Sequence, residues 1–157
     1  HEGTHDWTSD FLLKESGQMG DIRKTLSDEV RLNSDKWKQL YDQGLDANKL
    51  MGRENAISGY LANPTEVHAR IMQLRKALNM TPEQSKNVTP GQAKNIINII
   101  DEAPDQTFVD PKFLNIIDRD PKKLAYLFNR LWAVPPAAVA ASQLPEQKNG
   151  GWLNKYK

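Results

Sequence analysis

The sequence predicts an all-α protein built from short helices. The main observation is a polar capping residue followed by proline, which recurs at Asn63-Pro64, Thr81-Pro82, Thr89-Pro90, Asp110-Pro111 and Asp120-Pro121. The polar side chain accepts hydrogen bonds from the first helical turn, and proline fits the first helical position because its missing N–H would be unpaired there. The second observation is that no segment alternates apolar and polar residues with the two-residue period of a strand.

Three helices are expected in the first part of the chain. They are predicted to run from before His1 to about Glu15, around 21–32, and from a cap at Ser34 to Gly44. The second has Ile22, Leu26 and Val30 on one stripe, and the third would turn Trp37, Leu40 and Tyr41 inward. Residues 45–62 stay ambiguous because Gly52 and Gly59 interrupt them.

The best-defined helix is predicted to follow Asn63. Over residues 64–78 the apolar residues Val67, Ile71, Leu74 and Leu78 fall at i, i+4, i+7 and i+11, the spacing of one buried face. Further helices are predicted over 90–101, 111–117 and 121–132, each rich in Ile, Leu or Phe. The sequence therefore predicts a helical domain over 1–133.

After Ala133 the composition changes. Val134-Pro135-Pro136 stops the preceding helix, an alanine-rich stretch follows, and residues 145–151 are polar with Pro and Gly. We therefore predict that residues 134–157 form an extended tail or linker.

The composition excludes several function classes. The 157 residues suffice for one domain, and with 38% hydrophobic residues its core is lean. The 21 basic and 20 acidic residues are interleaved, which argues against nucleic acid as a partner because binding it needs a basic stripe. No apolar run approaches the roughly 20 residues of a membrane span, so no membrane partner is expected. Without cysteine there are no disulfides and no thiolate metal ligands.

The first five residues, His1-Glu2-Gly3-Thr4-His5, form an H-E-x-x-H motif. On a helix, His1 and His5 lie on one face and can share a zinc ion, and Glu2 projects beside the metal. Glu2 would there act as the catalytic base that deprotonates a zinc-bound water for attack on a peptide bond. Zinc is the expected cofactor, and a third ligand must come from farther along the chain, since Asp6-Trp7-Thr8 contains no histidine.

Downstream, Glu66-Val67-His68-Ala69-Arg70 contains Glu-x-x-Ala-Arg on a predicted helix. With H-E-x-x-H it resembles the gluzincin-type zinc metallopeptidases, over residues 1–7 and about 60–75. The resemblance implies that Glu66 is the third zinc ligand and that Arg70 holds its carboxylate as a supporting partner.

The family pattern also implies an upstream part. In such enzymes the zinc helix sits behind a substrate-binding sheet, which would have to precede His1. We therefore expect a zincin-like helical subdomain lacking its upstream sheet, the downstream part of a longer polypeptide. Its partners would be that upstream segment and a peptide or protein substrate.

Several of these residues have competing interpretations. Glu66 could instead complete a capping box with Asn63 or form an ordinary surface pair with Arg70. His68 is a competing ligand, but it points about 200° around the helix from Glu66, and we expect it to be exposed. Tyr60 and Tyr41 are candidate donors to an oxyanion, although a tyrosine more often serves packing.

A second resemblance lies near residue 150. Residues 149–156, Asn-Gly-Gly-Trp-Leu-Asn-Lys-Tyr, resemble a Gly-Gly-Trp-Leu-x-Lys-aromatic motif of large virion proteins in crAss-like tailed bacteriophages. This implies an alternative function, a non-catalytic structural or assembly component of a phage virion, cut from a polyprotein and docked on neighbouring virion proteins. The two resemblances together imply a virion or the bacterial cytoplasm as the location.

Overall fold

The computed structural model describes residues 7–133, with side chains from Asp10 onward, and the predicted tail 134–157 lies outside this range. Between Trp7 and Ala133 the chain forms helices and no strand, which confirms the all-α prediction. The helices are α1 (Trp7–Glu15), α2 (Gln18–Lys24), α3 (Asp28–Asp42), α4 (Ala47–Met51), α5 (Arg53–Leu61), α6 (Pro64–Ala77), α7 (Pro82–Lys86), α8 (Pro90–Glu102), α9 (Pro104–Thr107), the 3₁₀ helix η2 (Pro111–Ile117) and α10 (Pro121–Arg130).

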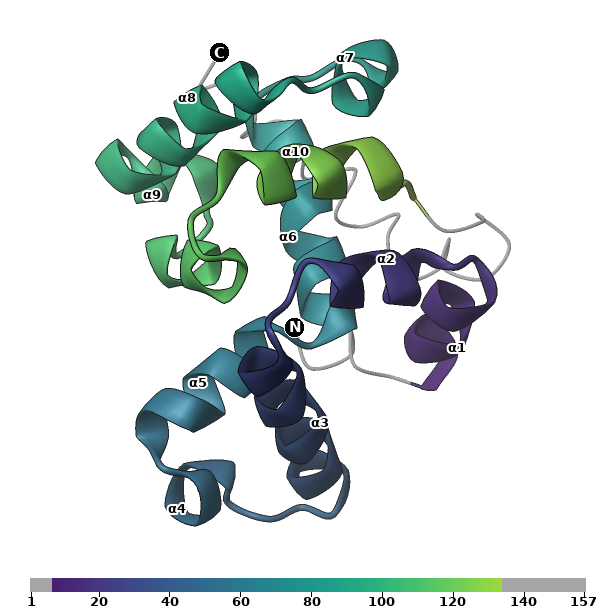
Figure 1. Cartoon of the computed structure of the whole chain (residues 1–157), viewed down its shortest axis with the longest axis vertical. Coiled ribbons are helices and arrows are strands. Elements are labelled where there is room, and N and C mark those ends of the chain that lie inside the picture. The colour runs from purple at the N-terminus through teal and green to yellow at the C-terminus, as the bar shows by residue number, and fades with distance from the viewer. Residues whose placement is uncertain (1–6, 134–157) are drawn as a thin grey trace.

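Helix α6 is the central element (Figure 1). Helix α10 crosses it, α7 and α8 lie toward one of its ends, α3–α5 lie beyond the other, and α1 and α2 lie to one side (Figure 1). Helix α9 also contacts α6. Val67, Ile71 and Leu74, the stripe predicted from their spacing, have no exposed surface. Because neighbours surround α6, even the polar residues of its first turn are buried.

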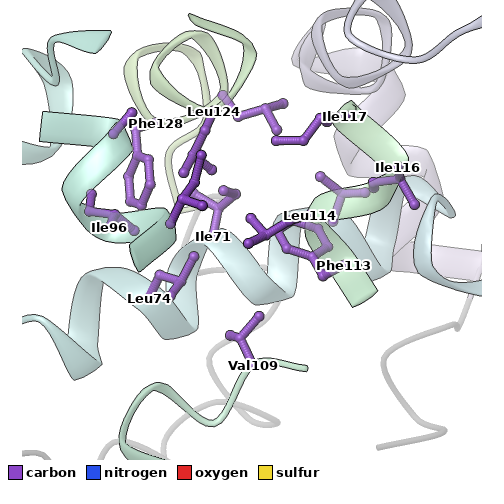
Figure 2. Packing of buried hydrophobic residues seen from close by; sticks show 14 of the residues in the cluster. Ile71, Leu74, Ile96, Val109, Phe113, Leu114, Ile116, Ile117, Leu124 and Phe128 are labelled. Atoms are coloured by element: carbon purple, nitrogen blue, oxygen red, sulfur yellow. The ribbon is translucent and has the colours of Figure 1, made fainter. Parts of the chain in front are cut away.

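The hydrophobic core is built where α6 meets α8, η2 and α10. In Figure 2, Ile71 and Leu74 of α6 face Ile96 of α8 and Leu124 and Phe128 of α10. The four apolar residues of η2, Phe113, Leu114, Ile116 and Ile117, are all at most 3% exposed. Elements far apart in sequence are therefore joined by one continuous apolar cluster.

The five predicted helix starts are confirmed as capping sites. Each capping side chain accepts from a first-turn backbone N–H: Asn63 from Thr65, Thr81 from Gln84, Thr89 from Gln92, Asp110 from Lys112 and Asp120 from Lys122. At Thr81 and Thr89 the glutamine three residues later bonds back to the cap, which completes a capping box.

The predicted ends of the first helix at about Glu15 and of the third near Gly44 are confirmed. The predicted boundaries between residues 24 and 34 are wrong. A single helix around 21–32 was expected, but α2 ends at Lys24 and α3 begins after Ser27, whose side chain accepts from the Val30 N–H. Ser34 caps nothing; it lies inside α3, buried, and its hydroxyl donates to the Ala62 carbonyl at 3.3 Å. The reason is that Ser27 precedes two acidic residues, which favour a helix N-terminus.

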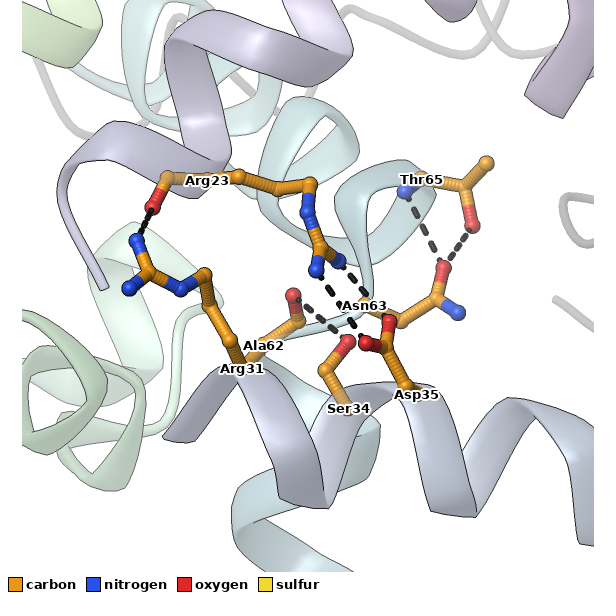
Figure 3. Close-up of polar contacts among 7 residues, drawn as sticks. All are labelled: Arg23, Arg31, Ser34, Asp35, Ala62, Asn63 and Thr65. Carbon is orange, nitrogen blue, oxygen red and sulfur yellow. Dashed lines mark hydrogen bonds and ion pairs between the residues drawn. The ribbon is translucent and has the colours of Figure 1, made fainter. Parts of the chain in front are cut away.

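The junction between α2, α3 and α6 is fixed by polar contacts (Figure 3). The Arg23 guanidinium donates to both carboxylate oxygens of Asp35, at 2.8 and 3.1 Å, and Arg31 donates to the Arg23 carbonyl at 3.3 Å.

The ambiguous stretch 45–62 becomes α4 and α5, separated at Gly52, which has a φ of 87°. Among the helices of residues 7–133, none has the length and apolar character that crossing a membrane requires.

Candidate functional site

The predicted zinc ligands His1 and His5 and the predicted base Glu2 lie outside the described residues. Helix α1, which follows the motif in sequence, packs against α6, the helix that carries Glu66. Helix α1 is also tied to α3, because the Asp10 carboxylate lies 3.2 Å from the Lys38 ammonium. The fold therefore brings the segment that follows the motif alongside the helix of the proposed third ligand.

Glu66 is a fully buried carboxylate in the first turn of α6. It forms an ion pair with Arg70, one turn on, whose guanidinium also donates to the Glu66 backbone carbonyl at 3.3 Å. The Arg70 side chain is only 15% exposed. Burial excludes the interpretation of an ordinary surface pair, and the desolvated charges depend strongly on each other.

The predicted capping box between Asn63 and Glu66 is not formed. The side-chain oxygen Oδ1 of Asn63 accepts from the backbone N–H of Thr65 at 3.1 Å and from the Thr65 hydroxyl at 2.6 Å. The Glu66 carboxylate turns toward Arg70 instead. Its orientation is thus set by a buried cation and not by the helix terminus.

Tyr60 of α5 completes a cluster with Glu66 and Arg70. The Arg70 guanidinium lies over its ring, 5.5 Å from the centroid. Burial raises the pKa of Tyr60, and the negative charge of Glu66 raises it further. The phenol therefore keeps its proton and can act as a hydrogen-bond donor.

Tyr60 also belongs to an aromatic group beside this cluster. Trp37 meets Tyr60 edge-on, with centroids 5.2 Å apart, and stacks on Tyr41 at 5.0 Å. The three rings line a cavity of about 340 Å³ between α3, α4 and α5. Tyr60 thus serves packing as well as the polar cluster, whereas Tyr41 stacks on Trp37.

The expectation that His68 is exposed is wrong. It is 8% exposed, and its Nε2 lies 2.8 Å from the Trp132 carbonyl oxygen. Because a carbonyl can only accept, Nε2 carries a proton and is committed to that bond. Burial lowers the pKa of His68, and the charge of Arg75 lowers it further. His68 is therefore a structural residue on the face of α6 covered by the end of α10.

Sequence reasoning missed the polar cluster around His68. The guanidinium of Arg75 donates to the carbonyls of Phe128 and Leu131, and the fully buried Gln18 accepts from the Trp132 N–H at 2.8 Å. These side chains fix the point where the chain leaves α10. The available signal was the i, i+7 spacing of His68 and Arg75, which places both on one face of a helix.

Glu66, taken by itself, has the chemistry of a zinc ligand. Zinc sites favour a carboxylate that a supporting partner orients, and Arg70 supplies that support. The side chains described from Asp10 to Ala133 contain no group of three or more His, Cys, Asp or Glu that could hold a metal ion. A complete site would therefore need His1 and His5.

Comparisons with known proteins found no matching family model, no similar curated protein and no similar solved structure.

Proposed function

We propose that this chain is part of a zinc-dependent metalloendopeptidase, with His1, His5 and Glu66 as the zinc ligands. The observation that carries the proposal is the burial of Glu66: a carboxylate with no exposed surface, oriented by Arg70, on a helix packed against α1. A buried charge is costly, and a protein retains it most readily where it performs a task.

In this proposal each residue has a distinct role. Zinc, when bound, supplies a Lewis acid that lowers the pKa of a water molecule. The Glu2 carboxylate would serve as the base that takes a proton from the attacking water, and it would return that proton to the leaving amine. Arg70 would position Glu66, and the Tyr60 phenol, whose raised pKa keeps it protonated, would be the donor to the developing oxyanion.

The test is metal content per chain by elemental mass spectrometry, on protein purified without chelators. We expect about one zinc per chain, lost in both His5→Ala and Glu66→Gln. The matched control is Glu83→Gln, an exposed glutamate in the first turn of another helix, which should retain zinc. Wild-type protein without zinc would refute the proposal.

A second variant separates metal binding from catalysis. Glu2→Gln should keep the zinc and abolish hydrolysis of a generic peptide substrate by the intact parent protein. Undiminished proteolysis by Glu2→Gln would contradict the assigned base while leaving the metal ligands in place.

The alternative, a structural component of a phage virion, is favoured by apolar side chains on the surface of α3 and the region of α4. Leu32 is 69% exposed, Leu45 48% and Leu50 54%, which suits docking on neighbouring proteins. The two functions are distinguished by the intact mass of natural material. Cleavage before His1 would divide the zinc helix and favour the structural role, whereas a longer chain would favour the enzyme.

A further inference from the structure

A groove of about 860 Å³ lies between the end of α6, α7 and α8, away from Glu66. We call it the α7–α8 groove; both helices lie toward the same end of α6 (Figure 1). Its apolar lining consists of Leu78, Met80, Val88, Ile96 and Ile99. Val88 and Ile96 belong to the core, whereas Ile99 is 38% exposed, so the groove is a surface extension of the core.

The polar lining consists of four amides, Gln84, Asn87, Gln92 and Asn95, together with Thr81 and Glu83. Gln84 and Gln92 each use the side-chain oxygen to accept the N–H of their capping threonine, at 2.9 and 3.0 Å. Their Nε2 groups donate no hydrogen bond within the described chain. Asn87 donates through Nδ2 to the Glu83 carbonyl at 3.0 Å, which leaves its oxygen to accept.

This arrangement suits an extended peptide. Side-chain amides can pair with backbone N–H and C=O groups of any sequence, while an apolar strip receives the side chains of an occupant. Glu83 is the only charged side chain that lines the groove in the described residues, so a basic occupant is favoured over an acidic one.

We propose that the α7–α8 groove binds residues 152–157 of the same chain, the Trp-Leu-Asn-Lys-Tyr-Lys segment that lies outside the described residues. Trp152 and Leu153 supply apolar side chains for the strip. Lys155 and Lys157 supply the positive charge that complements Glu83. This docking does not depend on zinc and goes beyond the proposed peptidase function.

The path of the chain supports an intramolecular occupant. Asn129, in the last turn of α10, accepts from the Val88 N–H at 2.8 Å and donates to the Val88 carbonyl at 3.0 Å. The chain therefore leaves α10 beside a residue that lines the groove. From Ala133, the chain up to Trp152 can span roughly 60 Å when extended. Tethering raises the effective concentration of the segment to the order of millimolar, so even weak docking is populated.

The test is fluorine NMR of the whole chain labelled with fluorotryptophan, with the Trp152 resonance assigned by Trp152→Phe. We expect this resonance to be displaced from its position in urea-unfolded protein. Ile99→Glu, which places a charge on the exposed edge of the apolar strip, should return it to the unfolded position. The matched control is Leu32→Glu, on exposed α3, which should leave the displacement unchanged.

A charge reversal provides a second test that leaves the apolar lining intact. Glu83→Lys should reduce the displacement of the Trp152 resonance, and adding Lys155→Glu and Lys157→Glu should restore it. The proposal is overturned if wild-type Trp152 already resonates at the unfolded position, or if Ile99→Glu behaves like Leu32→Glu. It is also overturned if the displacement rises with protein concentration and the mass is that of a dimer, because the occupant would then be a second copy.

Discussion

Substituting Gly59 by alanine tests the packing that places Tyr60 beside Trp37. A Cβ at Gly59 would lie 2.3 Å from the Asn33 carbonyl oxygen and 2.7 Å from the Trp37 Cβ. Ordinary contact begins near 3.4 Å, so α3 and α5 would have to separate by about 1 Å. Both obstacles lie on or next to the α3 backbone and cannot rotate away.

The magnitude is the balance of two effects. Overpacking against backbone costs about 3 kcal/mol, at the upper end of the usual range. The higher helix propensity of alanine compared with glycine offsets about 1 kcal/mol of this cost. We therefore expect Gly59→Ala to lower the free energy of unfolding by about 2 kcal/mol, and to lower the melting temperature by roughly 4–8 °C in a domain of this size.

The matched control is Gly20→Ala in α2. A Cβ there has no atom within 4 Å, so only the propensity gain of about 0.5–1 kcal/mol remains and the variant should be more stable than wild type. Urea unfolding followed by circular dichroism measures both variants. If Gly59→Ala were as stable as wild type, the close contact of α3 and α5 would be wrong.

Two further predictions concern buried charge. The pKa of His68 is lowered in the folded state, so the unfolded chain binds the proton more readily. The free energy of unfolding should therefore fall as the pH drops through the ordinary histidine pKa of 6.5. Thermal melts at a series of pH values should show that His68→Gln flattens this dependence. An unchanged pH profile in the variant would exclude His68 as its cause. Arg70→Met alone should cost about 3–5 kcal/mol in urea unfolding, because it leaves Glu66 buried without its cation, whereas Arg70→Met combined with Glu66→Met should cost much less. Additive costs for the two substitutions would show that the charges do not depend on each other.

Local signals predicted the second half of the fold better than the first. The capping residues and prolines at Asn63, Thr81, Thr89, Asp110 and Asp120 mark helix starts through contacts within a few residues, which a sequence contains in full. Between residues 24 and 34 the cap at Ser27 was missed and Ser34 was predicted instead, because the role of Ser34 depends on Ala62, far along the chain. Boundaries set by such tertiary contacts are not encoded locally.

In the candidate site, too, the features set by local spacing were predicted and those set by tertiary packing were not. The pairing of Glu66 with Arg70 follows from their i, i+4 spacing and was predicted. The burial of this pair could not be predicted, because it depends on α1 and α5 packing on α6. His68 was wrongly expected to be exposed for the same reason: the backbone that covers it, at Trp132, comes from the end of α10. Zinc binding by His1, His5 and Glu66 and the role of Glu2 stay predictions.

Helix α6 links the two halves of the molecule through polar groups as well as through the core. In its first turns Glu66 and Arg70 meet Tyr60 of α5, while His68 bonds the backbone at the end of α10. These contacts are made from different faces of α6, and they hold it against elements that precede and follow it in sequence. A rotation of α6 that exposed Glu66 would also remove the bond between His68 and Trp132. The carboxylate is therefore held in place by packing on both sides of its helix, which is the kind of rigid support that a metal ligand requires.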